Sequence, residues 1–180
     1  QAIQKKAAAG EPGAQVALGR AYQKGALLRK DLNKAFFWYK KAAVQGYAKG
    51  QRLLGVMYEL GLGVKKDCRQ AAAWYKKAAA QGIARAQVNL GMLYEDGCGV
   101  EQNYQSARQW YKKAAAKKYA RGEVQLGLLY EKGLGVDQNL NKAMSCYKKA
   151  ARSGYSRGML NAGRLYEFGP PAIKNKKNVF

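Results

Sequence analysis

A repeated six-residue sequence constrains this chain more than any other feature. The sequence Trp-Tyr-Lys-Lys-Ala-Ala occupies residues 38–43, 74–79 and 110–115, and Cys-Tyr-Lys-Lys-Ala-Ala occupies residues 146–151. Each copy begins 36 residues after the previous one. A Leu-Gly pair, followed three residues later by tyrosine, keeps the same interval at Gly55, Gly91 and Gly127. A fixed period of about 20 to 50 residues is typical of solenoids, which are stabilised between neighbouring repeats.

One repeat, residues 47–82, is predicted to form two helices joined by a tight turn. Leu54 and Tyr58 lie four residues apart and therefore share one face of the first helix. Gly55 costs roughly 1 kcal/mol of helix propensity relative to alanine, yet glycine recurs at this phase, so we expect a second helix to cross closely there. Gly61 and Gly63 provide the turn, because glycine readily adopts positive φ.

The second helix of the repeat is predicted to begin after Asp67, whose carboxylate can cap it. The corresponding residues of the other repeats are Asp31, Asn103 and Asn139. The buried face of this helix follows helical spacing and comprises Ala71, Trp74, Tyr75, Ala78 and Ala79. We expect the large Trp74 to meet small alanine and glycine residues, while Lys76 and Lys77 point to solvent.

The repeat phase divides the chain into segments of one continuous solenoid domain. Residues 1–10 correspond to the end of a truncated preceding repeat, and residues 155–169 to the first helix of a fifth repeat. The four complete repeats are residues 11–46, 47–82, 83–118 and 119–154. Repeat one has Gly25-Ala26-Leu27 in place of Gly-x-Gly, so its turn is expected to differ. Two prolines stop the last helix, and residues 170–180 are predicted to form a basic tail or cap.

The chain is strongly basic along its whole length. It carries 33 Lys and Arg against 11 Asp and Glu, no His, and a formal net charge of +22. Lysines on outer helix faces explain part of this excess, but the total favours an acidic partner or attraction to polyanions. No apolar run approaches the roughly 18 residues that span a membrane, and no secretory signal opens the chain, which begins inside a repeat.

The three cysteines stand at three different repeat positions. Their spacing matches no metal site and no even disulfide framework. Cys146 replaces the repeat's tryptophan and is expected to be a small core residue. We expect unpaired cysteines, with a Cys68–Cys98 bridge as the lesser alternative, so the redox compartment stays open.

The full repeat pattern identifies a family resemblance. It reads Ala-x-x-x-Leu-Gly-x-x-Tyr-x-x-Gly-x-Gly-Val, then Asp-x-x-x-Ala-x-x-Trp-Tyr-x-x-Ala-Ala-x-x-Gly, and it extends over residues 1–169. This pattern resembles that of the Sel-one-like repeat family, short relatives of the tetratricopeptide repeats. The resemblance implies an all-α, right-handed α/α superhelical solenoid that serves as a protein-binding scaffold. Relatives include degradation adaptors, host-interaction factors and immunity proteins, and many are periplasmic or lie in the secretory pathway. The cysteine-rich branch staples each hairpin with a disulfide, and this chain lacks that pair.

The resemblance also implies which residues face a partner, because the first helices of tetratricopeptide-like arrays line the concave groove. A cation stands near the start of four first helices, at Lys49, Arg85, Arg121 and Arg157. If stacked repeats lie about 10 Å apart, these four residues would form a row, which we call the basic ladder. Side-chain amides nearby could hold a partner's backbone. The predicted partner-binding residues are Lys49, Arg52, Arg85, Asn89, Arg121, Gln125, Arg157, Asn161 and Arg164. An acidic row follows the tyrosines at Glu59, Glu95, Glu131 and Glu167. The alternative interpretation is that these carboxylates pair with the ladder or with neighbouring lysines.

The sequence does not favour an enzyme. It has no histidine, its acidic residues are scattered, and its Gly-x-Gly segments recur at the repeat period, which makes them turns rather than phosphate loops. We therefore expect no catalytic residues, no metal, no cofactor and no small-molecule substrate.

Three functions compete. The first is an adaptor or inhibitor, such as an immunity protein of a secreted effector, whose basic groove binds an acidic protein. The second is binding of nucleic acid or another polyanion, which is disfavoured because most tyrosines and all tryptophans are predicted to be in the core. The third is a structural segment of a larger repeat protein.

Overall fold

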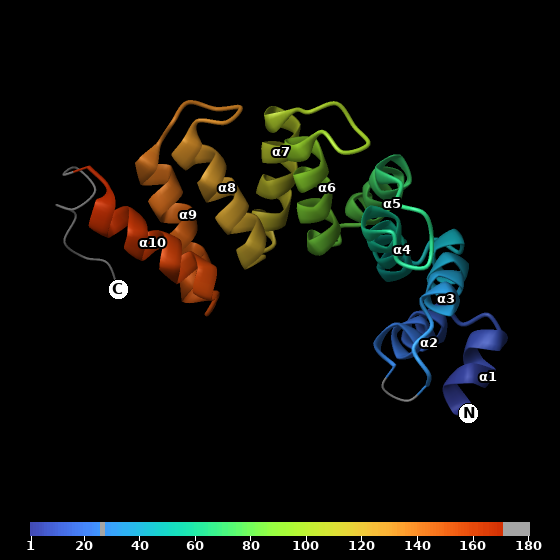
Figure 1. Ribbon diagram of the computed structural model, residues 1–180. Helices are drawn as coiled ribbons and strands as arrows, with labels where there is room; N and C mark the ends of the chain where they lie inside the picture. Colours follow the sequence, from blue (N-terminus) through green and yellow to red (C-terminus); the bar gives the residue numbers. More distant parts are fainter. Residues whose placement is uncertain (26–27, 171–180) are drawn as a thin grey trace. The chain divides into compact units, whose positions relative to one another are not determined.

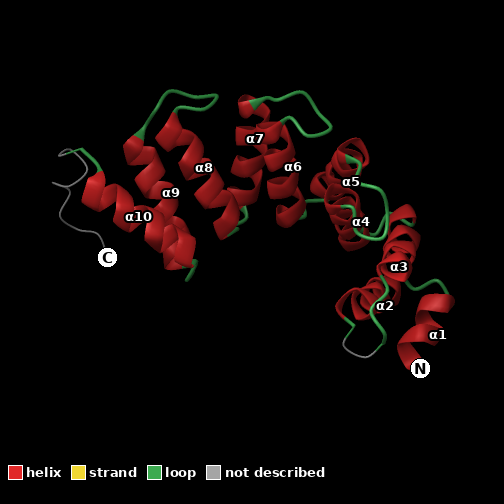
Figure 2. Ribbon diagram, viewed as in Figure 1, coloured by secondary structure: helices red, strands yellow, loops and turns green. Residues whose placement is uncertain are grey.

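The computed structural model describes residues 1–25 and 28–170 as helices and loops (Figures 1 and 2). From α2 onward every helix is 13 residues long, and successive helices begin alternately 20 and 16 residues apart, which together make the 36-residue repeat. The helices are α1 (Ala2–Ala8), α2 (Pro12–Lys24), α3 (Leu32–Val44), α4 (Ala48–Leu60), α5 (Cys68–Ala80), α6 (Ala84–Asp96), α7 (Tyr104–Ala116), α8 (Ala120–Lys132), α9 (Leu140–Arg152) and α10 (Ser156–Phe168).

These helices pack in consecutive pairs, and the pairs repeat every 36 residues to form an all-α solenoid. The predicted fold class is therefore confirmed, while the handedness of the superhelix stays a prediction. Two compact units are distinguished, residues 1–102 and residues 103–180. In the first unit α2 pairs with α3 and α4 with α5, and in the second α8 pairs with α9 (Figure 1).

The helix ends form where the sequence predicts them. The side chains of Asp31, Asp67, Asn103 and Asn139 each accept a hydrogen bond from the backbone N–H three residues later. This contact satisfies one of the N–H groups that a helix leaves free at its start. Gly61 ends α4 in the left-handed conformation, with φ 68°. The predicted caps and the predicted turn of repeat two are thus confirmed.

A tyrosine of the second helix fills the space that a glycine of the first helix leaves open. A Cβ atom built on Gly55 would lie 2.6 Å from the ring of Tyr75, and one on Gly127 would lie 2.5 Å from the ring of Tyr147. The close crossing is confirmed, but the aromatic residue that makes it is the tyrosine. Tyr75 is fully buried and meets Gly55, whereas Trp74 is half-buried and packs against a core cluster that contains Ala42 and Ala43. The expectation for Trp74 was therefore wrong for the glycine but holds for the alanines.

Each tryptophan lies at the border of the core, under a lysine. The ammonium groups of Lys77 and Lys113 lie 4.4 and 4.2 Å from the ring centroids of Trp74 and Trp110. Lys77 therefore covers an aromatic face rather than only pointing to solvent, which is a favourable cation–π arrangement.

A disulfide joins Cys68 at the start of α5 to Cys98 in the turn after α6, with their Cα atoms 5.4 Å apart. The expectation of unpaired cysteines was wrong for these two. The turn after α6 packs on the start of α5, the second helix of the preceding repeat, since a Cβ on Gly99 would meet the backbone of Cys68. The bridge therefore links consecutive repeats. Cys146 is free and half-buried, and burial raises the pKa of its thiol.

Two sequence predictions fall outside the described residues. One is the turn expected to differ at Gly25-Ala26-Leu27, which includes residues 26–27. The other is the basic tail or cap predicted for residues 170–180, of which only Pro170 is described. The division of repeats into a single continuous domain likewise stays a prediction.

Candidate functional site

The cations of the basic ladder occupy the second position of their helices. In the first unit Lys49 and Arg85 are exposed on α4 and α6. In the second unit Arg157 is exposed on α10, whereas Arg121 on α8 is half-buried and engaged in an interaction. Within residues 1–25 and 28–170, Lys49, Arg85 and Arg157 take part in no hydrogen bond or ion pair that would neutralise them. Three of the four predicted ladder residues thus present a charge to solvent.

Arg52 and Asn89 lie deeper, around the hydroxyl groups of buried tyrosines. Asn89 and the positive charge of Arg52 both act to lower the pKa of Tyr75, and Arg52 also acts to lower that of Tyr39. Burial raises the pKa of Tyr39 to about 12 despite the nearby charges of Arg20 and Arg52. Both predicted residues therefore belong to a polar layer between adjacent repeats of the first unit.

The acidic row has a structural task that the sequence interpretation missed. Tyr75 donates its hydroxyl hydrogen to Glu59, and Tyr147 donates to Glu131 at 2.6 Å. In repeat one Gln23 takes the same place and accepts from Tyr39 at 2.7 Å. Burial, followed by the neighbouring glutamate, raises the pKa of Tyr75, and burial with Glu131 does the same for Tyr147. These carboxylates hold the second helix against the first rather than opposing the basic ladder.

In the second unit, Arg164 completes one of these contacts. Its guanidinium donates to Glu131 at 2.5 Å, so Glu131 joins α10 to the α8–α9 pair. Gln125 and Asn161 are half-buried on α8 and α10. Asn161 lines a surface pocket of about 410 Å³ together with Met159, Leu160, Gly163, Arg164, Glu167 and Phe168.

A second polar layer consists of glutamines that the sequence interpretation did not single out. Gln15 and Gln51 are 2% and 5% exposed, and their amides donate to the carbonyls of Ala7 and Ala43. Their side-chain oxygens accept from Gln45 and Gln81, both at 2.8 Å. The recurrence of Gln at positions 15, 51 and 87 was the available signal.

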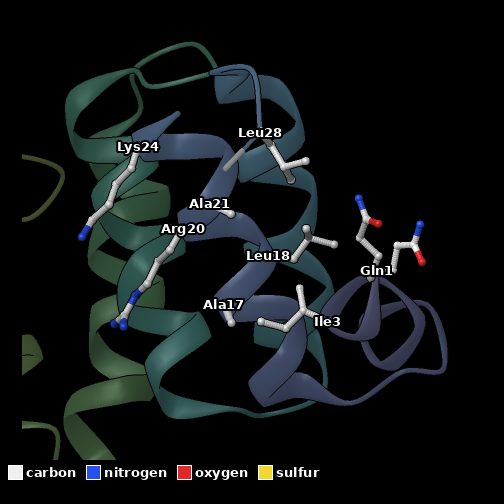
Figure 3. A pocket seen from close by; sticks show the side chains of 9 residues that line it. Gln1, Ile3, Ala17, Leu18, Arg20, Ala21, Lys24 and Leu28 are labelled. Atoms are coloured by element: carbon white, nitrogen blue, oxygen red, sulfur yellow. The ribbon is translucent and has the colours of Figure 1, made fainter. Parts of the chain in front are cut away.

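A further pocket lies between α1 and α2 at the first unit (Figure 3). It has a volume of about 380 Å³ and an apolar floor that includes Ile3, Leu18 and Leu28. Arg20 and Lys24 extend from α2 on its other side (Figure 3). The basic character of the first helices thus continues to α2.

Other site types are not formed by the described part of the chain. There, no group of three or more His, Cys, Asp or Glu residues is arranged to hold a metal ion. None of the helices between residues 1 and 170, with 26–27 set aside, has the length and apolar character needed to cross a membrane.

Helix pairs that repeat every 36 residues and pack through a Gly–Tyr crossing define an α/α repeat scaffold. The Sel1 repeat pattern matches residues 12–47, 48–83, 84–119 and 120–155. The chain belongs to the Sel1 repeat family, whose members are generally non-enzymatic scaffolds. No match was found among proteins with curated descriptions.

Solved structures resemble this chain over most of its length. The protective antigen c5321 of uropathogenic Escherichia coli strains shares 38% identity with a TM-score of 0.87, covering 93% of this chain and 36% of that one. A Sel1 repeat protein from Oxalobacter formigenes shares 37% identity with a TM-score of 0.84, covering 89% and 66%. The immunity protein Pa5087 of Pseudomonas aeruginosa shares 26% identity with a TM-score of 0.64, covering 96% and 64%. The chain thus spans 36% and 66% of the length of the first two proteins.

Proposed function

We propose that this chain is a non-enzymatic scaffold that binds an acidic partner protein through the basic ladder of its first helices. The observation that carries the proposal is the exposure of Lys49 and Arg85 at one phase of two successive repeats of the first unit; Arg157 is exposed at the same phase within the second unit. A cation without an internal partner keeps its charge available for an incoming carboxylate, and arginine side chains are frequent binding hot spots. The net charge of +22 would steer and accelerate the encounter with an acidic surface.

A narrower form of the proposal is an inhibitor or immunity protein that covers a toxic effector. The similarity to an immunity protein of Pseudomonas aeruginosa, at 26% identity over 96% of this chain, supports it. The Cys68–Cys98 disulfide supports a periplasmic or secreted location, because disulfides persist in oxidising compartments.

The test compares two charge-reversed forms of the chain as baits. One carries Lys49→Glu and Arg85→Glu on the first helices, and the control carries Lys40→Glu and Lys112→Glu on exposed positions of second helices. Both pairs of substitutions lower the net charge of the bait by the same amount, so they should weaken its non-specific attraction to polyanions equally. Baits are exposed to a nuclease-treated lysate of the source organism at low and moderate salt, and the affinity of the captured protein is then measured with purified components.

We expect the ladder variant to bind the partner at least about tenfold more weakly than the wild type, and the control to lose less than about threefold. Equal losses would rule out the ladder as the binding surface. Recovery of only a mixture that disappears at moderate salt, or of nucleic acid from a parallel lysate without nuclease, would instead favour the polyanion function, whose affinity depends steeply on salt.

A further inference from the structure

A buried carboxylate interrupts the glutamine layer in the second unit. Glu123 on α8 stands at the repeat position of Gln15, Gln51 and Gln87 and is 6% exposed. Among the described residues, none donates a hydrogen bond to its carboxylate. Burial raises the pKa of Glu123, and the charge of Lys149 acts in the opposite direction. The carboxylate thus has no donor among the described residues, and its oxygens are open to a pocket rather than enclosed, in contrast to Oε1 of Gln87, which is enclosed and unpaired.

The donor that serves the first two repeats is replaced here. Gln81 donates its amide to Gln51, at 2.8 Å, and to the carbonyl of Gly46, also at 2.8 Å. Ser153 occupies the position of Gln81, two repeats on, and its shorter side chain donates instead to the carbonyl of Ala150 at 2.7 Å. No carboxamide of the described second unit therefore takes the place that the Gln81 amide fills.

A pocket lies at this place. It has a volume of about 610 Å³, and its lining residues are Ala115, Ala116, Lys118, Glu123, Lys149, Arg152 and Ser153. We call it the Glu123 pocket. Lys118 stands at the position of Gly46, and its φ of 57° keeps the left-handed conformation that Gly46 has at 84°. The backbone that offers the second acceptor to Gln81 is thus preserved.

The charges around the pocket select what can enter. Lys118, Lys149 and Arg152 are exposed cations, whereas Glu123 is the single acidic lining residue. An ammonium or guanidinium group in this pocket would be repelled by the three like charges that line it. A neutral carboxamide has the N–H groups that Glu123 needs and no charge, and carboxylates beside it would meet the cations of the rim.

We propose that the Glu123 pocket binds the carboxamide of an asparagine or glutamine side chain within an acidic segment of a partner protein. The bound amide takes the place that Gln81 fills in repeat two, donating to Glu123 and to the Lys118 carbonyl. This inference rests on the proposed function in requiring an acidic protein partner, and it adds the side chain that the second unit recognises.

The probe is the acetylated peptide Asp-Glu-Gln-Glu-Asp with a free carboxyl terminus, titrated into the 180-residue chain and followed by NMR. Peptides with Leu or Lys in place of Gln have the same acidic flanks. We expect the Gln peptide to bind about tenfold more tightly than either, the factor typical of a hydrogen bond to a charged group. Equal affinities of the Gln and Leu peptides would overturn the proposal, and a preference for Lys would show an ion-pair site instead.

Variants of α9 and its cap provide the second arm. Ser153→Gln supplies the missing amide from the chain itself, so we expect it to fill the pocket and abolish the preference for the Gln peptide. Ser145→Gln makes the same change at an exposed position of α9 outside the pocket, and the preference should persist. A preference that survives in Ser153→Gln would contradict the proposal, provided that circular dichroism shows the variant folded.

The peptide assay separates this proposal from the ladder proposal. Lys49→Glu with Arg85→Glu lies in the first unit and should leave the preference for the Gln peptide unchanged. Loss of the protein partner with retention of this preference would support both proposals. Equal peptide affinities together with a ladder-dependent partner would reject the pocket alone.

Discussion

At residue 123 a glutamate stands where three other repeats have glutamine, and the exchange removes a donor as well as adding a charge. The amide of Gln87 donates to the carbonyl of Ala79 at 3.2 Å, which an ionised carboxylate cannot do. Burial of a charge is costly unless it is paired. The same backbone position therefore supports fully bonded amides at Gln15 and Gln51, an amide with an unpaired Oε1 at Gln87, and a carboxylate at Glu123.

We predict that Glu123→Gln stabilises the protein by about 1 kcal/mol at pH 7, the usual net contribution of a hydrogen bond. The carboxyl group holds its proton more tightly in the folded state, because burial raises its pKa above the ordinary value of 4.5. The folded protein therefore binds more protons between these two pKa values, and stability falls as the pH rises through them. The gain from glutamine should be smaller at pH 4, where the carboxyl is mostly protonated in both states.

Thermal unfolding at pH 4 and pH 7 measures this difference. Glu101→Gln, at an exposed loop position, removes the same charge and serves as the control. A gain that is identical at both pH values, or matched by Glu101→Gln, would contradict a specific cost at Glu123.

At the scale of helices, the α2–α3, α4–α5 and α8–α9 pairs are each held by a tyrosine packed on a glycine and by a hydrogen bond from the tyrosine hydroxyl. Gly163 on α10 has the same phase as Gly127 on α8, but no heavy atom of the described residues lies within 4 Å of a Cβ placed there. Substitution by alanine at Gly163 therefore measures the helix propensity of alanine alone, whereas the same substitution at Gly127 adds the cost of a steric clash.

We predict opposite effects for two identical substitutions. Gly127→Ala places a methyl group 2.5 Å from the Tyr147 ring and should destabilise by about 1–3 kcal/mol, as overpacked cores do. Gly163→Ala should stabilise by up to about 1 kcal/mol, because alanine favours the helix. Thermal unfolding followed by circular dichroism measures both, and equal effects would refute the close crossing.

The disulfide joins the turn after α6 to the start of α5 in the preceding repeat. Its removal by Cys68→Ser with Cys98→Ser should lower stability by about 3–4 kcal/mol, the value expected for a closed loop of about 30 residues. Reduction of the wild type should have a similar effect, whereas Cys146→Ser at the free cysteine should not reproduce it. Unchanged melting temperatures of the wild type with and without reductant would contradict this prediction.

At the scale of the whole chain, few acidic residues are left to balance the basic ones. Glu59 and Glu131 accept from tyrosines, and Asp31 and Asp67 cap helices. These internal tasks hold carboxylates at fixed positions, while cations such as Lys49 and Arg85 remain exposed. Exposed cations such as these place part of the net charge of +22 at the surface.

The sequence predicted the helices well because its period places caps and glycines at the same points of each repeat. It could not choose between Trp74 and Tyr75, since both lie on the apolar stripe and only the crossing of the helices decides which meets Gly55. For the basic ladder, the sequence predicted the exposed cations Lys49, Arg85 and Arg157, but it did not indicate that Arg121 is half-buried. Arg52 and Asn89 looked like surface residues, yet they lie at tyrosine hydroxyls that only the packing of neighbouring repeats brings to them.

Comparison of repeat positions would have revealed the disulfide. Residues 68 and 98 correspond to Leu32 and Leu62 in the preceding repeat and to Tyr104 and Leu134 in the following one. An apolar pair in two repeats that becomes a cysteine pair in the third indicates two positions that face each other. Spacing within a single repeat could not show this, because the two cysteines belong to different repeats.

The bridge has a mechanical consequence. When a solenoid is pulled from both ends its helices unravel, but the 30-residue interval between Cys68 and Cys98 cannot lengthen while their bond is intact. At about 3.6 Å per extended residue, roughly 110 Å of contour is withheld. The segment between the two cysteines therefore stays closed under force, and reduction of the disulfide by a thiol allows it to extend.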